Sequence, residues 1–290
     1  MKRIHGAIAL ALMFVCVACN LGTVIKYEML FLIKAENTQD RDEAIEVIKQ
    51  RLVLLGADKE AIGHVDADHI SIVEIRGDSI PLQEMEKMLS FSARDSYLVP
   101  VEEAGLLQFM RLDSLLSSII IREGGLNLVS AADTAIVNQK FKAYAAATGR
   151  AEDDLLWTES PNARIEKSVG TYYEVYLGKQ EASKVPLTVQ TVEDASITVD
   201  GSGRLAISIH LHEAWINDWA KMTREQIGGK VAIVFDGKVL SAPTVMSEIK
   251  EGELMISGYF EIAELERIRV SISSPPLPAG TSVQAKVGYH

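Results

Sequence analysis

Apolar and polar residues follow one another in short blocks, and their spacing predicts a chain of mixed helices and strands. Apolar residues at every second position, or in short unbroken runs, indicate strands, whereas apolar residues three and four apart indicate amphipathic helices. Thr38 is the expected N-cap of the first helix, and Pro81 is expected in the first turn of the second. The first third of the chain reads strand, helix, strand, helix, strand, at residues 27–34, 38–55, 69–77, 81–91 and 96–102.

The remainder of the chain continues this mixture, with more helix in the middle and more strand after residue 187. Both element types therefore recur along the whole chain. The predicted elements are helices at 103–121 and 131–147, a loop at 150–170, a strand at 171–179, a hairpin at 195–212, a helix at 213–229, strands at 231–235 and 252–260, a helix at 261–274 and a closing strand at 280–289.

The stretch 231–243, VAIVFDGKVLSAP, carries the clearest local signal in the chain. Its first five residues are apolar on both faces, which is typical of a strand covered on both sides. Asp236-Gly237 favours a type I′ turn, because both central residues of that turn need positive φ. We therefore expect a hairpin whose apolar residues belong to the core and whose tip, Asp236, Gly237 and Lys238, is free to contact a partner.

The first twenty residues read as an export signal. Two cations precede an apolar run that ends at Cys19-Asn20. The run has the length of a secretory h-region and is shorter than the roughly 20 residues of a membrane span. Val17-Ala18-Cys19 is similar to a bacterial lipobox, although Cys16 stands where leucine is usual. This pattern predicts a signal peptide at 1–18, lipidation of Cys19 and a tether at 19–26; an uncleaved signal anchor and a plain secreted protein are the alternatives.

Composition narrows the classes of partner. The 290 residues carry a formal net charge of −11 and no run rich in Lys or Arg, so a protein that binds the phosphate backbone of nucleic acid is excluded. After the leader, no segment approaches the length of a membrane span. We therefore expect the mature chain to be held at a membrane by its lipid alone, facing the periplasm. Asn20, which stands where Asp would favour the inner membrane, favours the outer membrane.

Residues 223–279 resemble the first periplasmic domain of SecD, a membrane component that assists bacterial protein export. The segments that carry the resemblance are TREQIG at 223–228, the hairpin at 231–243, ISGYF at 256–260 and the stretch from Leu265 to Ala279. Upstream, 185–215 is similar to a strand pair of the family, and 43–77 to its first helix and strand. The middle of the chain resembles the longer insertion of fused SecDF proteins of Bacteroidetes-type bacteria.

The resemblance implies an α+β fold with a two-part architecture. A ferredoxin-like base, made from residues 27–102 and 263–290, would carry an inserted α+β head, with a helical connection at 103–185 and a head core at 186–262. The family's proton-coupled cycle depends on membrane spans that are not evident in this sequence. The chain is therefore expected to bind unfolded or extended polypeptide, or Sec export components, without running that cycle alone.

The residues give little support to a metal site or a catalytic site. His210 and His212 have a spacing that can hold a metal, but no third His or Cys lies at ligand spacing. Asp153-Asp154 and the acidic residues 40–43 are expected to serve solubility and a helix N-terminus. Trp215 and Trp219 are expected in the core. Hydrolase and P-loop motifs are absent from the sequence.

These observations predict a protein that is not an enzyme, with no metal and no cofactor. The leading hypothesis is a lipid-anchored SecD-type module that acts in protein secretion or envelope biogenesis. The alternative is a structural or interaction lipoprotein that kept the fold and lost the export role.

Overall fold

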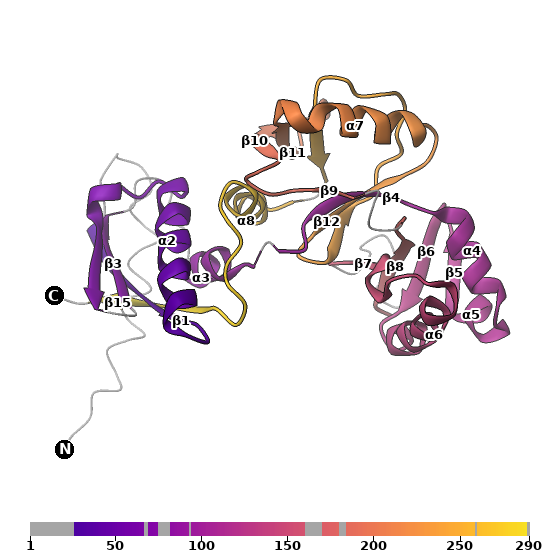
Figure 1. The fold of residues 1–290 in the computed structure, drawn as a ribbon, viewed down its shortest axis with the longest axis horizontal. Helices are drawn as coiled ribbons and strands as arrows, with labels where there is room; N and C mark the ends of the chain where they lie inside the picture. The colour runs from indigo at the N-terminus through magenta and orange to yellow at the C-terminus, as the bar shows by residue number, and fades with distance from the viewer. Residues whose placement is uncertain are drawn as a thin grey trace, which may run out of the picture. The chain divides into compact units, whose positions relative to one another are not determined.

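The computed structural model describes residues 26–66, 69–74, 82–92, 94–159, 170–179, 184–258 and 260–288 (Figure 1). The predicted leader, Cys19 and Pro81 lie outside the described residues. The chain divides into two compact units, of which unit 1 comprises residues 1–90 and 278–290 and unit 2 comprises residues 91–277.

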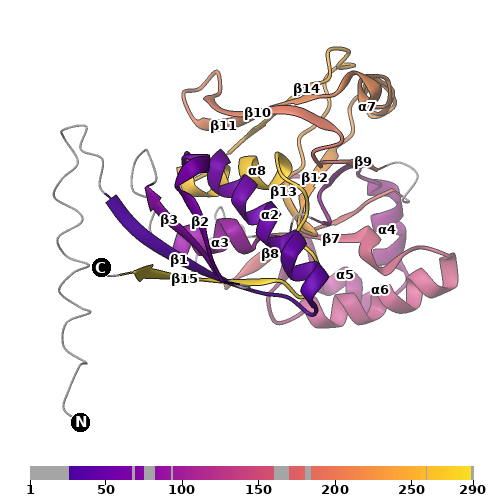
Figure 2. The same cartoon turned by 60° about the vertical axis from the view of Figure 1, so that its left-hand side comes forward.

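The described part of unit 1 contains an antiparallel sheet, whose strands come from both ends of the chain, and helices from the N-terminal segment (Figure 2). Its strands stand in the order β15-β1-β3-β2, and every neighbouring pair is antiparallel. The chain order strand-helix-strand-strand-helix-strand with this arrangement is the ferredoxin-like fold, which confirms the predicted fold class. The elements are β1 (Lys26–Lys34), α2 (Thr38–Leu54), β2 (Ile62–Asp66), β3 (His69–Glu74), α3 (Leu82–Ser90) and β15 (Ser282–Gly288).

The core of unit 1 lies between this sheet and its helices. Phe31 and Ile33 of β1 are fully buried, as are Ile48 and Leu52 on the apolar stripe of α2. The N-cap of α2 is Asn37 and not the expected Thr38, because the Asn37 side chain accepts the Asp40 N–H at 2.9 Å.

The described residues of unit 2 form two sheets. The larger one has the strand order β5-β6-β8-β7-β13-β12-β4-β9, and the smaller one has the order β10-β11-β14. The strands are β4 (Tyr97–Pro100), β5 (Ile120–Glu123), β6 (Leu126–Ser130), β7 (Leu155–Thr158), β8 (Tyr172–Leu177), β9 (Val185–Pro186), β10 (Val192–Val199), β11 (Leu205–Leu211), β12 (Val231–Phe235), β13 (Lys238–Ser241) and β14 (Glu253–Ser257). The α-helices are α4 (Glu103–Arg111), α5 (Ser114–Ile119), α6 (Thr134–Thr148), α7 (Glu213–Glu225) and α8 (Ile262–Ile272).

The boundaries of the two units differ from those expected for base and head. We expected β4 and α8 in the base, but both belong to unit 2. β4 pairs with β12, with Leu98 opposite Ile233, and α8 packs against β10 and β11. The base sheet is completed instead by β2, a short strand whose Gly63 and Asp66 interrupt the apolar pattern.

The segment 103–121, expected as one helix, consists of α4, α5 and the start of β5. The break falls at Asp113, whose Oδ1 accepts the Leu115 N–H at 2.9 Å and so caps a new helix. The β-branched residues Ile120 and Ile121 then pair with β6. A further strand, β7, lies in the segment that was expected as a loop.

The hairpin of β12 and β13 has the predicted turn. Asp236 has φ of 50° and Gly237 has φ of 74°, which are the positive values that a type I′ turn needs. All five residues of β12 are buried, because Val231, Ile233 and Phe235 pack into one core cluster and Ala232 and Val234 pack into another on the opposite face.

Candidate functional site

An apolar groove lies in unit 2 beside the outer edge of the smaller sheet. Its volume is about 250 Å³, and α7, β12, β14 and the segment 243–249 contribute its walls. Met246 is 83% exposed on one wall and Met255 is 50% exposed on another. Methionine side chains are flexible and polarizable, so they suit a surface that adapts to different apolar partners. The other lining residues are Trp219, Val231, Ile233, Pro243, Thr244, Val245, Ser247, Ile249 and Leu254.

The strand β14 forms one wall of the groove and the edge of its sheet. It pairs with β11 in a register that places Ser208 opposite Met255 and Ile209 opposite Leu254. In the same register the Leu211 N–H donates to the Gly252 carbonyl at 2.9 Å. Because paired and unpaired positions alternate along an antiparallel ladder, Glu253, Met255 and Ser257 direct their backbone groups away from β11.

The alternation along β14 separates two faces. Leu254 and Ile256 are buried in the core cluster that also contains Trp219, whereas Glu253 and Met255 are exposed on the other face. The Trp219 indole Nε1 donates to the outward-facing Glu253 carbonyl at 3.3 Å. Among the described residues, no backbone hydrogen bond is found to the outward-facing groups of Met255.

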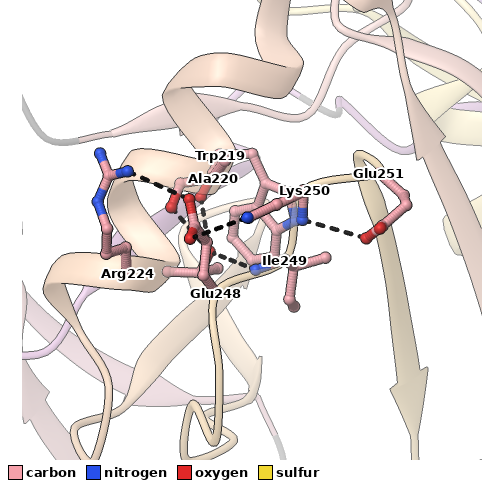
Figure 3. A network of polar contacts seen from close by, with 8 residues as sticks. Trp219, Ala220, Arg224, Glu248, Ile249, Lys250 and Glu251 are labelled. Atoms are coloured by element: carbon pink, nitrogen blue, oxygen red, sulfur yellow. Dashed lines mark hydrogen bonds and ion pairs between the residues drawn. The ribbon is translucent and has the colours of Figure 1, made fainter.

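The segment 248–251, next to the groove, contacts α7 through a network of polar contacts (Figure 3). Thr223 is fully buried, and its Oγ1 accepts the Ile249 N–H at 3.0 Å and donates to the Trp219 carbonyl at 3.0 Å. Near this hydroxyl, Glu248 Oε1 lies 3.2 Å from Arg224 Nη1, and Glu248 Oε2 lies 3.8 Å from Lys250 Nζ. Such exposed ion pairs add little stability, so the hydroxyl is the principal fastening.

The buried side-chain amide of Gln226 holds the segment between α7 and β12 in position. Its Nε2 donates to the Val101 carbonyl at 3.1 Å and to the Lys230 carbonyl at 3.0 Å. The backbone after Gln226 then pairs with the groove segment, since the Gly228 N–H donates to the Val245 carbonyl at 2.8 Å. In the sequence, the stretch TREQIG served only to carry the family resemblance. In the structure, its Thr223 and Gln226 side chains hold the walls of the groove in position.

The predicted hairpin tip is bound partly to its own chain. The Ser92 hydroxyl donates to Asp236 Oδ1 at 2.6 Å, and the Asp236 N–H donates to the Ser96 Oγ at 3.1 Å. The Gly237 N–H donates to the Asp95 carbonyl at 2.8 Å. Lys238 is exposed. The tip residues do not line the groove, and contact of this tip with a partner stays a prediction.

The two histidines singled out in the sequence do not share a strand. His210 lies on β11 with Nδ1 3.6 Å from Glu253 Oε1, whereas His212 precedes α7 and donates its backbone N–H to the Thr191 carbonyl at 2.9 Å. In the part of the chain that the structure describes, no three His, Cys, Asp or Glu side chains come together as a metal site. Trp219 is buried in the core, and Trp215 packs against it partly exposed.

Asp154 is the described carboxylate with the most unusual setting. It is 1% exposed, and within the described residues neither of its oxygens has a hydrogen-bond partner. Burial raises the pKa of this carboxyl, against the opposing effect of Lys184 and of Arg150, whose guanidinium lies 3.6 Å away. Its neighbour Asp153 is exposed, 3.5 Å from Lys184. Asp153 and Asp154 therefore lie in different environments: the first carboxylate is exposed beside Lys184, and the second is buried.

Comparison with known proteins connects the groove to one family. Residues 170–279 match the family model described as SecDF, P1 head subdomain. The chain is 32% identical over 129 residues to the protein translocase subunit SecD of Leptotrichia buccalis, covering 43% of this chain and 32% of that protein. It is 31% identical over 97 residues to the protein translocase subunit SecDF of Thermus thermophilus, covering 33% of this chain and 13% of that protein. The chain thus spans about a third or less of the length of these relatives.

A solved structure shares the fold across both units. The chain described as the crystal structure of SecDF in super-membrane-facing form superposes with a TM-score of 0.51 at 19% identity, covering 96% of this chain and 34% of that one. Among the described residues, no helix has the length and apolar character required to cross a membrane. The predicted resemblance is confirmed for residues 170–279, which supply every residue that lines the groove and are similar to the P1 head subdomain of SecDF.

Proposed function

We propose that this chain is a non-enzymatic, lipid-anchored module that binds extended polypeptide in the periplasm, in protein export or envelope biogenesis. The observation that carries the proposal is the open apolar groove beside β14, in the segment that is similar to the SecDF P1 head. An apolar groove with methionine on its walls accepts side chains of different shapes, as a binder of many unfolded chains must. The relatives are named as translocase subunits, which fits such clients.

The charges beside the groove are mixed. Glu251 and Glu253 are exposed near it, and so are Arg224 and Lys250. Apolar contact is therefore expected to set the affinity for a client. Charge on the client changes mainly the rate of encounter, an effect that added salt weakens.

The binding test uses a protein that stays unfolded, reduced and carboxymethylated α-lactalbumin, with affinity measured by fluorescence anisotropy. We expect Met246→Glu and Met255→Glu each to weaken binding, because a charge in an apolar contact must be desolvated. Val199→Glu is the matched control, since Val199 is exposed at 58% but does not line the groove. Absence of binding by the wild-type chain, or equal loss in the control, would refute the proposal.

A second test separates export from the alternative role. A photocrosslinking side chain at position 246 of the full chain in its own bacterium should capture unfolded secretory proteins or Sec components, and the same group at position 199 should not. A specific partner unrelated to export, together with normal secretion after gene deletion, would favour the structural or interaction lipoprotein.

A further inference from the structure

We infer that the bound polypeptide adds to the smaller sheet as a fourth strand, antiparallel like the strand pairs already in that sheet and hydrogen-bonded to the outer edge of β14 at Met255. This inference rests on the proposed function, because it states how the groove would hold its client. Unpaired N–H and C=O groups at a sheet edge are a template for another backbone, and recognition through the backbone tolerates many sequences.

The backbone geometry of β14 selects Met255 as the pairing point. The position opposite it on β11, Ser208, belongs to a pair that does not exchange hydrogen bonds, so both polar groups of Met255 face outward. Two residues earlier, the Glu253 carbonyl already accepts the Trp219 indole at 3.3 Å. The open template is therefore short, running from Met255 toward Ser257, and it favours a brief contact over a stable one.

Apolar contacts in the groove would add to the affinity that an added strand gains from its backbone hydrogen bonds. A residue of the client that pairs with Met255 has its side chain on the exposed face, and the residues on either side of it have theirs on the face of Leu254. Leu254 belongs to the buried cluster with Trp219, Val231 and Ile233, which are the apolar lining of the groove. The client side chains on either side of the residue that pairs with Met255 would therefore enter the groove.

The same alternation predicts the client pattern. Apolar side chains at every second position, with polar residues between them, satisfy the groove and the solvent face together. Lysine near the ends suits the exposed Glu251 and Glu253. A suitable probe is a fluorescent peptide of about nine residues, the length of a single strand, with alternating leucine and threonine and a lysine at each end.

Backbone N-methylation of this peptide tests the pairing. In the inferred arrangement the threonines direct their N–H groups toward β14 and the leucines direct theirs away. N-methylation of the threonines should weaken binding by about tenfold or more, because a hydrogen bond is lost and a methyl group is pushed against the strand. N-methylation of the leucines should change the dissociation constant by less than about threefold.

A matched pair of protein variants tests the same contact from the other side. Met255→Pro removes the outward N–H, and proline is tolerated at sheet edges; Met255→Ala keeps the N–H and removes the side chain. We expect the peptide to bind the proline variant more weakly than the alanine variant, and circular dichroism establishes that both are folded. If Met255→Pro does not fold, the N-methylated peptides decide the question alone.

The possible outcomes separate the two proposals. If the unmodified peptide and carboxymethylated α-lactalbumin both fail to bind, the proposed function itself is wrong. If they bind, but both N-methylated peptides bind equally, or folded Met255→Pro binds as well as Met255→Ala, the added strand is overturned and the proposed function stands.

Discussion

The hydrogen bond from the Ile249 N–H to Thr223 Oγ1 predicts the effect of Thr223→Val on the groove. Valine has nearly the same shape, so the change removes the hydroxyl without opening a cavity. The Trp219 carbonyl keeps its helical partner, since the residue four positions later donates its backbone N–H. The Ile249 N–H, which donates to Thr223 Oγ1 at 3.0 Å in a partly buried site, is left without this partner.

The expected free-energy cost comes from leaving the Ile249 N–H unsatisfied. Leaving a buried donor unsatisfied costs about 1–3 kcal/mol. If the cost falls on the local opening of the segment 246–252, the protection of the Ile249 amide against hydrogen exchange decreases by roughly 5- to 150-fold. Because this segment forms one wall of the groove, affinity for carboxymethylated α-lactalbumin should decrease as well.

Hydrogen exchange followed by mass spectrometry on peptides that cover 246–252 measures this directly. Thr223→Ser is the control: it keeps the hydroxyl and loses one buried methyl group, worth about 1 kcal/mol. The control should lower overall stability but leave the protection of the segment near that of the wild type. Unchanged exchange in Thr223→Val, or equal loss in Thr223→Ser, would show that the hydroxyl does not hold this wall.

Three further predictions concern separate parts of the chain. Gly237→Ala should destabilise unit 2 by about 1–2 kcal/mol in chemical denaturation because φ is positive there, whereas Gly201→Ala, in an open turn, should be near neutral; equal effects would contradict the strain argument. Burial raises the pKa of Asp154 above its ordinary 3.8, so this carboxyl supports the fold fully only below that ordinary value, and the support is lost as the pH rises through the folded-state pKa. Asp154→Asn should therefore gain stability relative to the wild type between about pH 3 and pH 7, and a difference in melting temperature that stays constant with pH would oppose this. Cys19→Ser should abolish fatty-acid labelling and membrane association, and persistent labelling would exclude lipidation at Cys19.

The parts of the fold that depend on neighbouring residues were predictable. The positive φ of Asp236 and Gly237 follows from the residues themselves, and α7 and β12 lie where the apolar spacing placed them. The break in the helix predicted at 103–121 was missed because a side-chain cap at Asp113 outweighed a continuous apolar pattern. β2 was missed because Gly63 and Asp66 weaken its alternation, while pairing with β3 stabilises it.

The candidate site was predictable only in part. The sequence singled out the segment 223–260, and the groove is built mostly from it. It suggested the hairpin tip as the contact, whereas the tip donates and accepts hydrogen bonds within its own unit. No sequence signal distinguished Met246 and Met255 as exposed methionines, because isolated methionines are as common in cores as on binding surfaces.

The sequence alone determined the local elements, the tight turn at Asp236-Gly237 and the resemblance to an export domain. The tertiary structure decided which strands share a sheet, and so it assigned β4 and α8 to unit 2 and gave β14 an open edge. The physical reason is that apolar spacing states which face of an element is buried but not which partner covers it. Strand pairing is set by contacts between distant residues, such as Leu98 with Ile233, whose stability depends on the whole core.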